Sequence, residues 1–512
     1  MHLEVALKNH FGMEGFRRGQ KEIIESVLAL NDTLAVLPTG GGKSLCYQLP
    51  SVVFEGLIVV VSPLIALMKD QVRSLGELGL QAGGIYSGQS LDEKKDVFFR
   101  LSKSKQFVLL LSPERVQSEA FKKWFLTAKN LKLVAIDEAH CISQWGPDFR
   151  NEYYQLSVLR ELRPDIPILA LTATATPKVL GDISKSLKLR SPNKYVFGFY
   201  RNNIFIEVRE TSDDDEKALI LETALDATPE GRVIVYCGTR KQAEELSARF
   251  NESYLGVGHY HAGLSPENRK QIQEDLSSSK IRILFATNAF GMGIDYPNVR
   301  LVVHYSMPSN IESYYQEIGR AGRDGKKSRA LLLYSKKDKG LQVFFIQSSD
   351  ADSFVKSRRW DGLNTFVNFL EGGECRHSGI LTYFKDKDRI TDCGHCDICD
   401  PSGKFVFVKK IKSQLEEFSA KTKSRKNKPE KYLIEQNLGP EAQLRFQKLK
   451  EWRLRFSREN DIAAFIVFSD KTLRDLVQKN PKDLAGLNSV YGFGEKKLDW
   501  IGKDVLAELA GC

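Results

Sequence analysis

Residues 33–44 have the sequence Thr-Leu-Ala-Val-Leu-Pro-Thr-Gly-Gly-Gly-Lys-Ser, an apolar run followed by a glycine-rich turn. The apolar run predicts a β-strand, and the stretch after the turn has the spacing of a helix. Glycines in such a turn let backbone N–H groups surround phosphate oxygens, while a lysine adds positive charge and a hydroxyl can bind magnesium. A strict phosphate loop has glycine where Leu37 stands, but the strand–turn–helix context favours phosphate binding over a structural turn. The candidate residues are Thr39, Gly40, Gly41, Gly42, Lys43 and Ser44.

Short β-branched runs recur along the chain, several of them followed by a polar turn and an amphipathic stretch. The first group comprises Thr33–Leu37, Leu57–Val61, Phe107–Leu111, Leu133–Ile136 and Ile168–Leu171. The pattern stops near Pro192 and resumes with Val233–Cys237, Ile281–Ala286, Leu301–His304 and Ala330–Tyr334. Near-continuous apolar strands alternating with helices are typical of parallel sheets covered on both faces. We therefore predict an α/β fold with two tandem doubly wound parallel-sheet domains, joined around residues 200–215.

Two carboxylates and a histidine follow one of these predicted strands, in the sequence Leu133-Val-Ala-Ile-Asp-Glu-Ala-His140. Ligands of doubly wound sheets bind at the carboxyl ends of strands, so this turn should lie near the phosphate loop. Asp137 would hold Mg²⁺, Glu138 would orient and deprotonate an attacking water, and His140 would couple the site to its surroundings. An Asp-Glu pair alone is often a surface turn, and the phosphate loop on the same predicted sheet argues against that alternative.

Two arginines lie between glycines in Gln316-Glu-Ile-Gly-Arg-Ala-Gly-Arg-Asp-Gly325. Arg320 and Arg323 are three residues apart, which on a helix places them on one face. Phosphoryl transfer needs positive charge on the γ-phosphate, and arginine supplies it bidentately. Since these arginines belong to the second predicted domain, ATP would lie between the domains, and its hydrolysis would open and close the cleft, as a motor requires. The alternative is a solvated arginine helix.

Together these motifs resemble a superfamily 2 helicase core with two RecA-like domains, and the residues within the motifs are similar to those of the RecQ family. The resemblance implies that Gln20 reads the adenine edge, that Arg17 supports this pocket, and that Gln316 belongs to the catalytic set. It covers residues 1–340 in ten motifs in the family's order. The further matching segments are Phe16–Gln20, Ser62–Gln71, Ser112–Arg115, Leu171–Ala175, Tyr236–Arg240, Tyr260–Leu264 and Ala286–Asp295.

The segment Cys141-Ile-Ser-Gln-Trp-Gly-Pro-Asp-Phe-Arg150 resembles the aromatic-rich loop that in RecQ proteins links DNA contact to ATP hydrolysis. Trp145 and Phe149 can stack on unpaired bases, and Arg150 can pair with a phosphate. A lone tryptophan is often a core residue, but two aromatics and an arginine in a Gly-Pro loop beside the catalytic acid favour DNA contact.

Four of the eight cysteines lie within 25 residues, at Cys375, Cys393, Cys396 and Cys399. Two consecutive Cys-x2-Cys spacings suit a closed tetrahedral Zn²⁺ site of structural type. Two nearby histidines, His377 and His395, are competing ligands, and the family pattern assigns the four cysteines. The alternative is a group of free buried thiols.

The tail from Lys448 to Leu509 resembles the HRDC domain found in many RecQ proteins, through Ala464–Leu473 and Val490–Lys497. Phe465 and Lys497 are its candidate DNA contacts.

RecQ proteins typically carry a winged helix between the zinc site and HRDC, but only 43 residues separate Cys399 from Gln443. We expect the winged helix to be missing, which puts duplex binding and fork separation in doubt. The expected domains are 1–200 and 201–337 (RecA-like), 338–405 (zinc-binding), 406–440 (basic linker) and 441–512 (HRDC-like).

The chain has 75 Lys and Arg against 65 Asp and Glu, a net charge of +10 that favours a polyanionic partner. No signal peptide or membrane-spanning run is evident, so we expect a cytoplasmic, nucleoid-associated and monomeric protein. The leading hypothesis is an ATP- and Mg²⁺-dependent 3′–5′ DNA helicase of recombination and repair that acts on single-stranded and forked DNA, with single-stranded-DNA-binding protein as an expected partner. The alternatives are an RNA helicase and an ATPase that binds or anneals strands with little unwinding.

Overall fold

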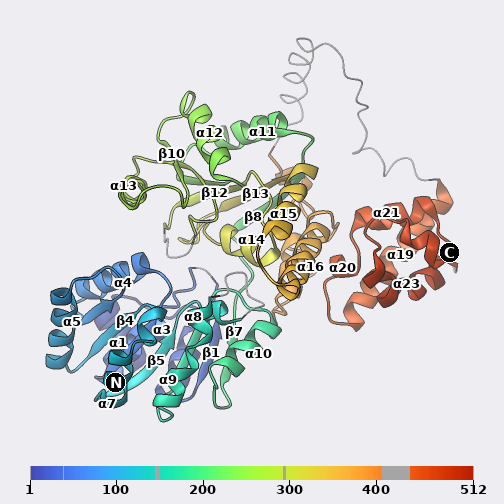
Figure 1. The fold of residues 1–512 in the computed structure, drawn as a ribbon. Helices are drawn as coiled ribbons and strands as arrows, with labels where there is room; N and C mark the ends of the chain where they lie inside the picture. Colours follow the sequence, from blue (N-terminus) through green and yellow to red (C-terminus); the bar gives the residue numbers. More distant parts are fainter. Residues whose placement is uncertain (1, 39, 144–149, 292–295, 406–438, 511–512) are drawn as a thin grey trace.

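The computed structural model describes residues 2–38, 40–143, 150–291, 296–405 and 439–510. A seven-stranded parallel sheet, sheet A, has the strand order β3-β4-β2-β5-β6-β1-β7 (Figure 1). Its strands are β1 (Thr33–Val36), β2 (Leu57–Val61), β3 (Ala82–Ile85), β4 (Phe107–Leu111), β5 (Leu131–Ile136), β6 (Ile168–Thr172) and β7 (Asn193–Val196). Its helices are α1 (Leu3–Phe11), α2 (Gln20–Leu28), α3 (Leu45–Phe54), α4 (Ile65–Glu77), α5 (Leu91–Lys103), α6 (Pro113–Val116), α7 (Glu119–Thr127), η1 (Ala139–Ile142), α8 (Asn151–Tyr154), α9 (Ser157–Leu162) and α10 (Pro177–Ser186).

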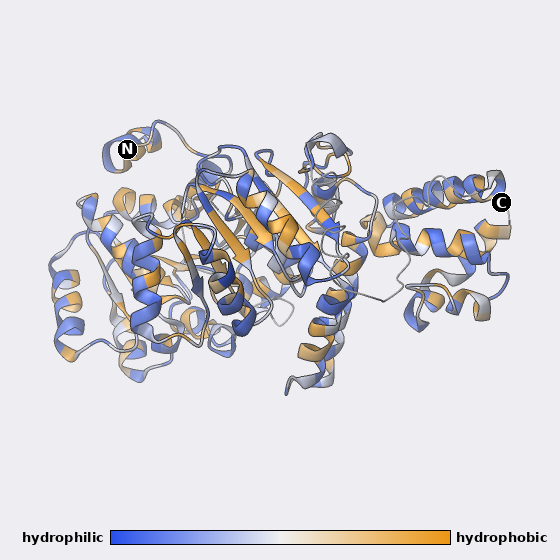
Figure 2. Cartoon of the chain, turned by 90° about the horizontal axis from the view of Figure 1, so that it is seen from above, coloured by the Kyte–Doolittle hydropathy of each residue, from blue (hydrophilic) through white to orange (hydrophobic). Residues whose placement is uncertain are grey.

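A second parallel sheet, sheet B, has six strands in the order β10-β11-β9-β12-β13-β8. The strands are β8 (Ile204–Glu210), β9 (Arg232–Tyr236), β10 (Val257–Tyr260), β11 (Ile283–Ala286), β12 (Val299–His304) and β13 (Ser328–Tyr334). The helices are α11 (Asp214–Asp226), α12 (Arg240–Asn251), α13 (Pro266–Ser277) and α14 (Ile311–Ile318). In Figure 2 the strands are mostly orange, while the surrounding helices carry blue and orange turns, as expected of sheets buried between amphipathic helices.

In the remaining described residues the regular elements are helices. Residues 336–403 contain α15 (Lys336–Ser348), α16 (Ser353–Leu370), α17 (Arg376–Tyr383) and η2 (Pro401–Gly403). We call α16, α17 and the cysteine-rich segment up to Gly403 the cysteine module. Residues 440–510, the C-terminal helical unit, contain α19 (Pro440–Glu459), α20 (Ala464–Val467), α21 (Asp470–Lys479), α22 (Leu484–Asn488) and α23 (Glu495–Ala510). No helix among the described residues is both long and apolar enough to cross a membrane.

The cysteine module covers the exposed edge of sheet B. Cys396 forms an isolated parallel bridge with Ile206 of the edge strand β8, and the Asp397 N–H donates to the Ile206 carbonyl at 2.9 Å. The Val208 N–H in turn donates to the Asp397 carboxylate at 3.4 Å. An uncovered edge strand exposes unpaired backbone groups, so the module both satisfies these groups and becomes part of the second sheet domain.

The predicted fold class is confirmed, with two tandem parallel sheets followed by helices. The expected connection is too long, however, because residues 204–210 form strand β8. Its sequence, Ile-Phe-Ile-Glu-Val-Arg-Glu, alternates as an edge strand does, and that alternation is weaker than an apolar run. Strand β7 extends sheet A beyond Pro192, where the apolar pattern stops, by pairing with β1.

Candidate nucleotide site between the two sheets

The order β5-β6-β1 in sheet A determines which turns meet. Strand β6 pairs with β1 on one side and with β5 on the other. In a parallel sheet the carboxyl ends lie along one edge, so the phosphate loop after β1, Thr172 at the end of β6 and Asp137 after β5 become neighbours. The sequence pattern predicted the first and last of these turns on one sheet, and the structure places Thr172 between them.

The glycine turn after β1 is packed closely by the N-terminal segment. Gly40 and Gly42 have φ angles of 81° and 74°, a left-handed backbone that favours glycine. The buried Gln20 donates from Nε2 to the carbonyls of Gly41 and Gly42 at 3.2 and 3.0 Å, and its Oε1 accepts from the Arg17 N–H at 2.8 Å. The Arg17 guanidinium also donates to the Gly40 carbonyl. The two residues expected to form an adenine pocket thus hold the phosphate turn in place.

The acidic turn after β5 is buried beside this loop. Asp137 is only 5% exposed. Burial, with the nearby Glu138 carboxylate, raises the pKa of Asp137 to about 7, and the charge of Lys43 opposes that rise. Glu138 has a positive φ of 49°, a strained conformation for a non-glycine residue at the point where chemistry is expected.

A chain of polar contacts leads from Glu138 to the second sheet domain. The Glu138 carboxylate lies 3.3 Å from Nδ1 of the fully buried His140, which lies 2.9 Å from the Thr172 hydroxyl. That hydroxyl donates to the Thr174 carbonyl at 3.0 Å. The Thr174 hydroxyl accepts from Nε2 of Gln316, on α14, at 2.9 Å. The carboxylate is therefore connected, through three side chains and the backbone of Thr174, to the helix that precedes the two arginines.

Arg323 crosses from the second sheet domain to the phosphate loop. A Cβ atom placed on Gly40 would lie 3.2 Å from Cγ of Arg323, so the Arg323 side chain packs against Gly40 and leaves little room for a side chain there. Arg320 is 8% exposed, and a Cβ on Gly291 would lie 3.3 Å from its Nη2. Both arginines therefore come from sheet B, and one of them touches the phosphate turn of sheet A.

The expectation that Arg320 and Arg323 share one helical face is wrong. Helix α14 ends at Ile318, and residues 319–325 form turns, with Gly322 and Gly325 at φ angles of 56° and 78°. Three glycines in seven residues do not favour a helix, because each costs about 1 kcal/mol relative to alanine. The arginines are instead positioned by the contacts that hold these turns.

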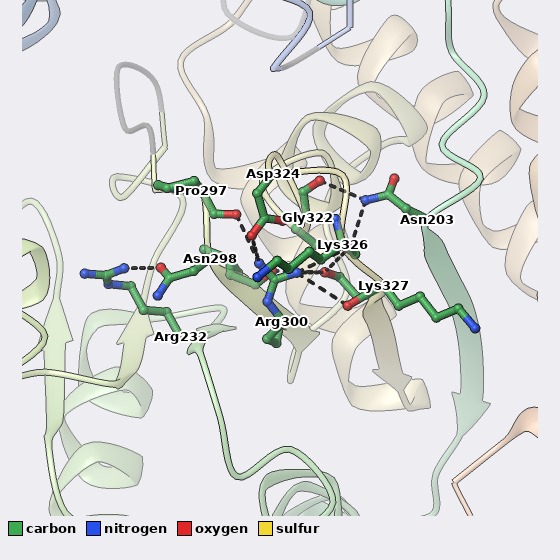
Figure 3. Close-up of polar contacts among 12 residues, drawn as sticks. Asn203, Arg232, Pro297, Asn298, Arg300, Gly322, Asp324, Lys326 and Lys327 are labelled. Carbon is green, nitrogen blue, oxygen red and sulfur yellow. Dashed lines mark hydrogen bonds and ion pairs between the residues drawn. The ribbon is translucent and has the colours of Figure 1, made fainter.

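Figure 3 shows the polar contacts that hold the arginine turn, which the sequence patterns did not reveal. Asn203 donates to the carbonyls of Gly322 and Lys326 at 2.8 and 3.0 Å. Arg300, on β12, donates to the carbonyls of Pro297 and Lys326, each at 3.3 Å, and pairs with Asp324. The arginine turn is thus tied to its own sheet at both ends. The only sequence signal was a polar pair at the domain connection, Asn202-Asn203, which has no distinctive pattern.

The four predicted zinc ligands converge. Their Sγ atoms all lie within 4.8 Å of one another, with Cys393–Cys399 at 3.9 Å and Cys396–Cys399 at 3.5 Å. Zn–S bonds of about 2.3 Å in a tetrahedron require S–S edges of about 3.8 Å, so the thiols fit a closed zinc site. These separations are far too long for disulfides, which have S–S bonds of about 2.05 Å.

The two competing histidines lie beside the thiols. His377 and His395 can form a second cluster with Cys393, and their rings are 4.6 Å apart. Burial, together with His395, lowers the pKa of His377 to about 4, and its Nε2 lies 3.0 Å from the Ile204 carbonyl. A neutral imidazole that donates to this carbonyl anchors the module on strand β8, and the four-thiol set has the separations that zinc needs.

Of the other predicted site residues, Ser44 and Arg150 lie within the described part of the chain. Ser44 accepts from Nε2 of Gln71 at 2.8 Å through its hydroxyl. Arg150 donates to the Pro63 carbonyl at 3.2 Å. Thr39, Trp145 and Phe149 lie outside the described residues, as does the segment 406–438, on which the expectation of a missing winged helix rests.

The proposed role of Phe465 in contacting DNA is contradicted. Its side chain is 2% exposed and packs edge-to-face on Phe369 of the cysteine module, with ring centroids 5.4 Å apart. A base cannot stack on a ring that is already covered. Lys497, the second candidate in this unit, is half-buried, and burial lowers its pKa to about 8.

Comparisons with known families match four segments. Residues 17–183 match the DEAD/DEAH box helicase family and 216–325 the helicase conserved C-terminal domain. Residues 336–400 match the RecQ zinc-binding family and 443–509 the HRDC domain. The S. cerevisiae protein Dbp5 bound to RNA and ADP BeF3 superposes with a TM-score of 0.52 at 18% identity, over 70% of this chain and 97% of that one. The fold and the family matches therefore define a protein with the two-domain core of helicases.

Individual relatives identify the family within this class. The chain is 41% identical to "ATP-dependent DNA helicase RecQ" of Bacillus subtilis over 76% of its own length, and 40% identical to the Haemophilus influenzae protein of the same name over 80%. The match spans 66% of each of these relatives, just under two thirds of their length. With the RecQ-specific zinc-binding domain at residues 336–400, the chain belongs to the RecQ helicase family.

Proposed function

We propose that this chain is an ATP-dependent DNA helicase that moves 3′ to 5′ on single-stranded DNA in recombination and repair. The observation that carries the proposal is the contact of Arg323 with Gly40, which makes the nucleotide site a joint product of both sheet domains. A site completed by two domains couples the state of the nucleotide to their separation. The bacterial relatives named as DNA helicases support the choice of DNA.

Each residue near the phosphate turn has a proposed role in hydrolysis. Gly40 to Lys43 bind the phosphates, and Ser44 and Asp137 are placed to hold Mg²⁺, which would neutralise phosphate charge when bound. Glu138 is placed to accept a proton from the attacking water. Arg320 and Arg323 stabilise the negative charge that develops on the γ-phosphate. Gln20 and Arg17 would exchange their contacts with the glycine turn for contacts with adenine.

The polar chain from Glu138 through His140, Thr172 and Thr174 to Gln316 is the proposed route that couples hydrolysis to domain movement. It joins the proposed proton acceptor to α14 by direct contacts. The loop that ends at Arg150 begins directly after His140 in the sequence, so DNA bound there would act on the same histidine. Trp145 and Phe149 remain proposed stacking residues of that loop.

The finer assignments concern the oligomeric state, the location, the form of the DNA and a partner. We propose that the protein acts as a monomer in the bacterial cytoplasm, on single-stranded and forked DNA, with single-stranded-DNA-binding protein as a partner. The net charge of +10 supports a polyanionic substrate. The proposed domain boundaries are 1–200, 201–337, 338–405, 406–440 and 441–512. Two helices begin just before a boundary, α15 at Lys336 and α19 at Pro440, and the other strands and helices lie within them.

The test of the substrate is ATP hydrolysis measured with matched DNA and RNA strands. Single-stranded DNA of mixed sequence should raise kcat strongly, and RNA of the same sequence should not. Trp145→Ala should lower the DNA-stimulated rate more than the basal rate, since stacking on bases contributes about 1–3 kcal/mol per base. Equal stimulation by RNA would contradict the assignment to DNA, and equal loss of both rates in the variant would contradict a sensor loop.

A further inference from the structure

The C-terminal helical unit, which matches the HRDC domain, lies against the cysteine module, with α20 beside α16 (Figure 1). We propose that residues 361–397 of the cysteine module are the docking surface for this domain, and that zinc orders this surface, so that zinc binding determines where the HRDC domain sits. The HRDC domain would then be a fixed part of the motor rather than a tethered accessory. This inference does not depend on the proposed helicase activity.

Phe465 is the anchor of the contact. It belongs to the hydrophobic core of the module, with Phe366, Phe369 and Ile380, and not to the core of its own domain. The HRDC core is formed by a separate set around Leu449, Trp452, Phe468, Leu473, Val505 and Leu509. A large aromatic side chain that packs into the core of a neighbouring domain is typical of a specific interface. Such buried aromatic residues contribute most of the binding free energy between two surfaces.

Glycines in the module make room for this approach. A Cβ on Gly379 would lie 3.0 Å from Cε1 of Phe465, and one on Gly372 would lie 3.4 Å from its Cβ. A Cβ on Gly373 would lie 1.9 Å from the Asp470 carboxylate, which pairs with the buried Arg453 of α19 at 2.7 Å. The side chains of Phe465 and Asp470 therefore occupy space that only glycines leave open.

Ion pairs surround the anchor and fix the orientation. Lys471 lies 2.8 Å from Glu371 and 3.9 Å from Glu210, at the end of strand β8. Elsewhere on the rim, Lys496 pairs with Asp361 and Lys385 with Asp461, each at 2.9 Å. Exposed pairs contribute little to stability, so they specify the register while Phe465 supplies most of the affinity. Both surfaces belong to one chain, and linked partners meet at effective concentrations of about millimolar.

The zinc site orders the docking surface through one buried ion pair. Arg376, next to the ligand Cys375, makes two bonds to Asp397, at 2.9 and 3.0 Å, and Asp397 is next to the ligand Cys396. The same guanidinium donates to the carbonyls of Phe369 and Gly372 at 2.6 and 3.3 Å. The end of α16, where Phe465 docks, is therefore held by residues whose neighbours bind the metal.

Carbodiimide coupling of the full-length zinc-loaded chain tests the proposal, because it joins amines to carboxylates only when they touch. We expect the products Lys496–Asp361, Lys471–Glu371 and Lys385–Asp461 by mass spectrometry. The yields of Lys496–Asp361 and Lys385–Asp461, whose carboxylates are exposed, should be comparable to that of Lys188–Glu161, an internal control pair at 2.7 Å in the first sheet domain. The yield of Lys471–Glu371 should be lower, because the Glu371 carboxylate is nearly buried. Formation of the control product without the three HRDC products would overturn the proposal.

Two variants and one treatment sharpen the test. Phe465→Ala should lower the three yields roughly tenfold or more, since it removes a buried aromatic anchor. Phe446→Ala, at a partly buried phenylalanine on the HRDC core, should leave them unchanged. Hydrogen exchange of α19 and α23 should show that the HRDC domain stays folded in both variants.

Removing zinc with a chelator under reducing conditions should abolish the three products but not the control product. Persistence of the products in Phe465→Ala or without zinc would contradict the proposal.

Discussion

Replacing Arg323 with alanine is expected to lower DNA-stimulated ATP turnover roughly a thousandfold while changing ATP affinity far less. The arginine comes from sheet B, yet it touches Gly40 of the phosphate turn in sheet A. A cation in that position stabilises charge that develops mainly in the transition state, so its loss lowers kcat more than it raises KM. Steady-state hydrolysis with saturating single-stranded DNA measures both constants.

The matched control is Lys327→Ala, which removes an exposed cation from the same turn. The Lys327 contact that the structure shows is its backbone carbonyl, which accepts from Arg300 at 3.4 Å, so this variant should keep nearly full turnover. If the two variants lose activity equally, the effect is one of net charge and the composite site is wrong. If Arg323→Ala retains turnover, the proposed function of this arginine is wrong.

Cys393→Ser is expected to produce a chain without stoichiometric zinc and with a zinc-binding domain that unfolds at roughly 5–10 °C lower temperature. Serine is a poor zinc ligand, and the remaining three thiols cannot close the tetrahedron. Metal analysis and a thermal melt, both under reducing conditions, measure the two effects. Cys237→Ala, which changes a buried cysteine of sheet B far from the cluster in sequence, should retain one zinc ion per chain. Full zinc content in Cys393→Ser would exclude this cysteine as a ligand.

The central strands could be predicted from the sequence because burial on both faces leaves a nearly continuous apolar run. The peripheral strands could not. Strand β3 has the sequence Ala-Gly-Gly-Ile, and β10 contains Gly258 and His259, so neither has an apolar run. Strand β8 reads as part of the connection because the charged residues Glu207, Arg209 and Glu210 interrupt its apolar run. These strands are specified by pairing with their neighbours, which local sequence does not encode.

The residues proposed for phosphate chemistry could be named from the sequence, whereas the residues that hold them in place could not. Lys43, Asp137, Glu138 and the two arginines stand in motifs whose spacing reflects phosphate chemistry. The contacts of Asn203 and Arg300, which hold the arginine turn, are made across long sequence separations to backbone carbonyls. Any polar residue at many positions can make such bonds, so no pattern marks them.

The position of Phe465 at the HRDC interface could not be predicted from the sequence either. Phe465 lies in a sequence similar to HRDC domains, and an aromatic there suggested a DNA contact. The structure places it in the core of another module, because Gly372 and Gly379 leave room for it. Helical spacing distinguishes an apolar face from a polar one, but it does not identify what covers that face.

The most direct test of the account is strand separation on a forked DNA with a 3′ single-stranded tail. With ATP and Mg²⁺ the chain should release the labelled strand. It should not do so with a non-hydrolysable ATP analogue, and Lys43→Ala should bind the fork without releasing the strand. Hydrolysis stimulated by DNA with no displaced strand would contradict the helicase assignment and leave an ATPase that only binds or anneals strands.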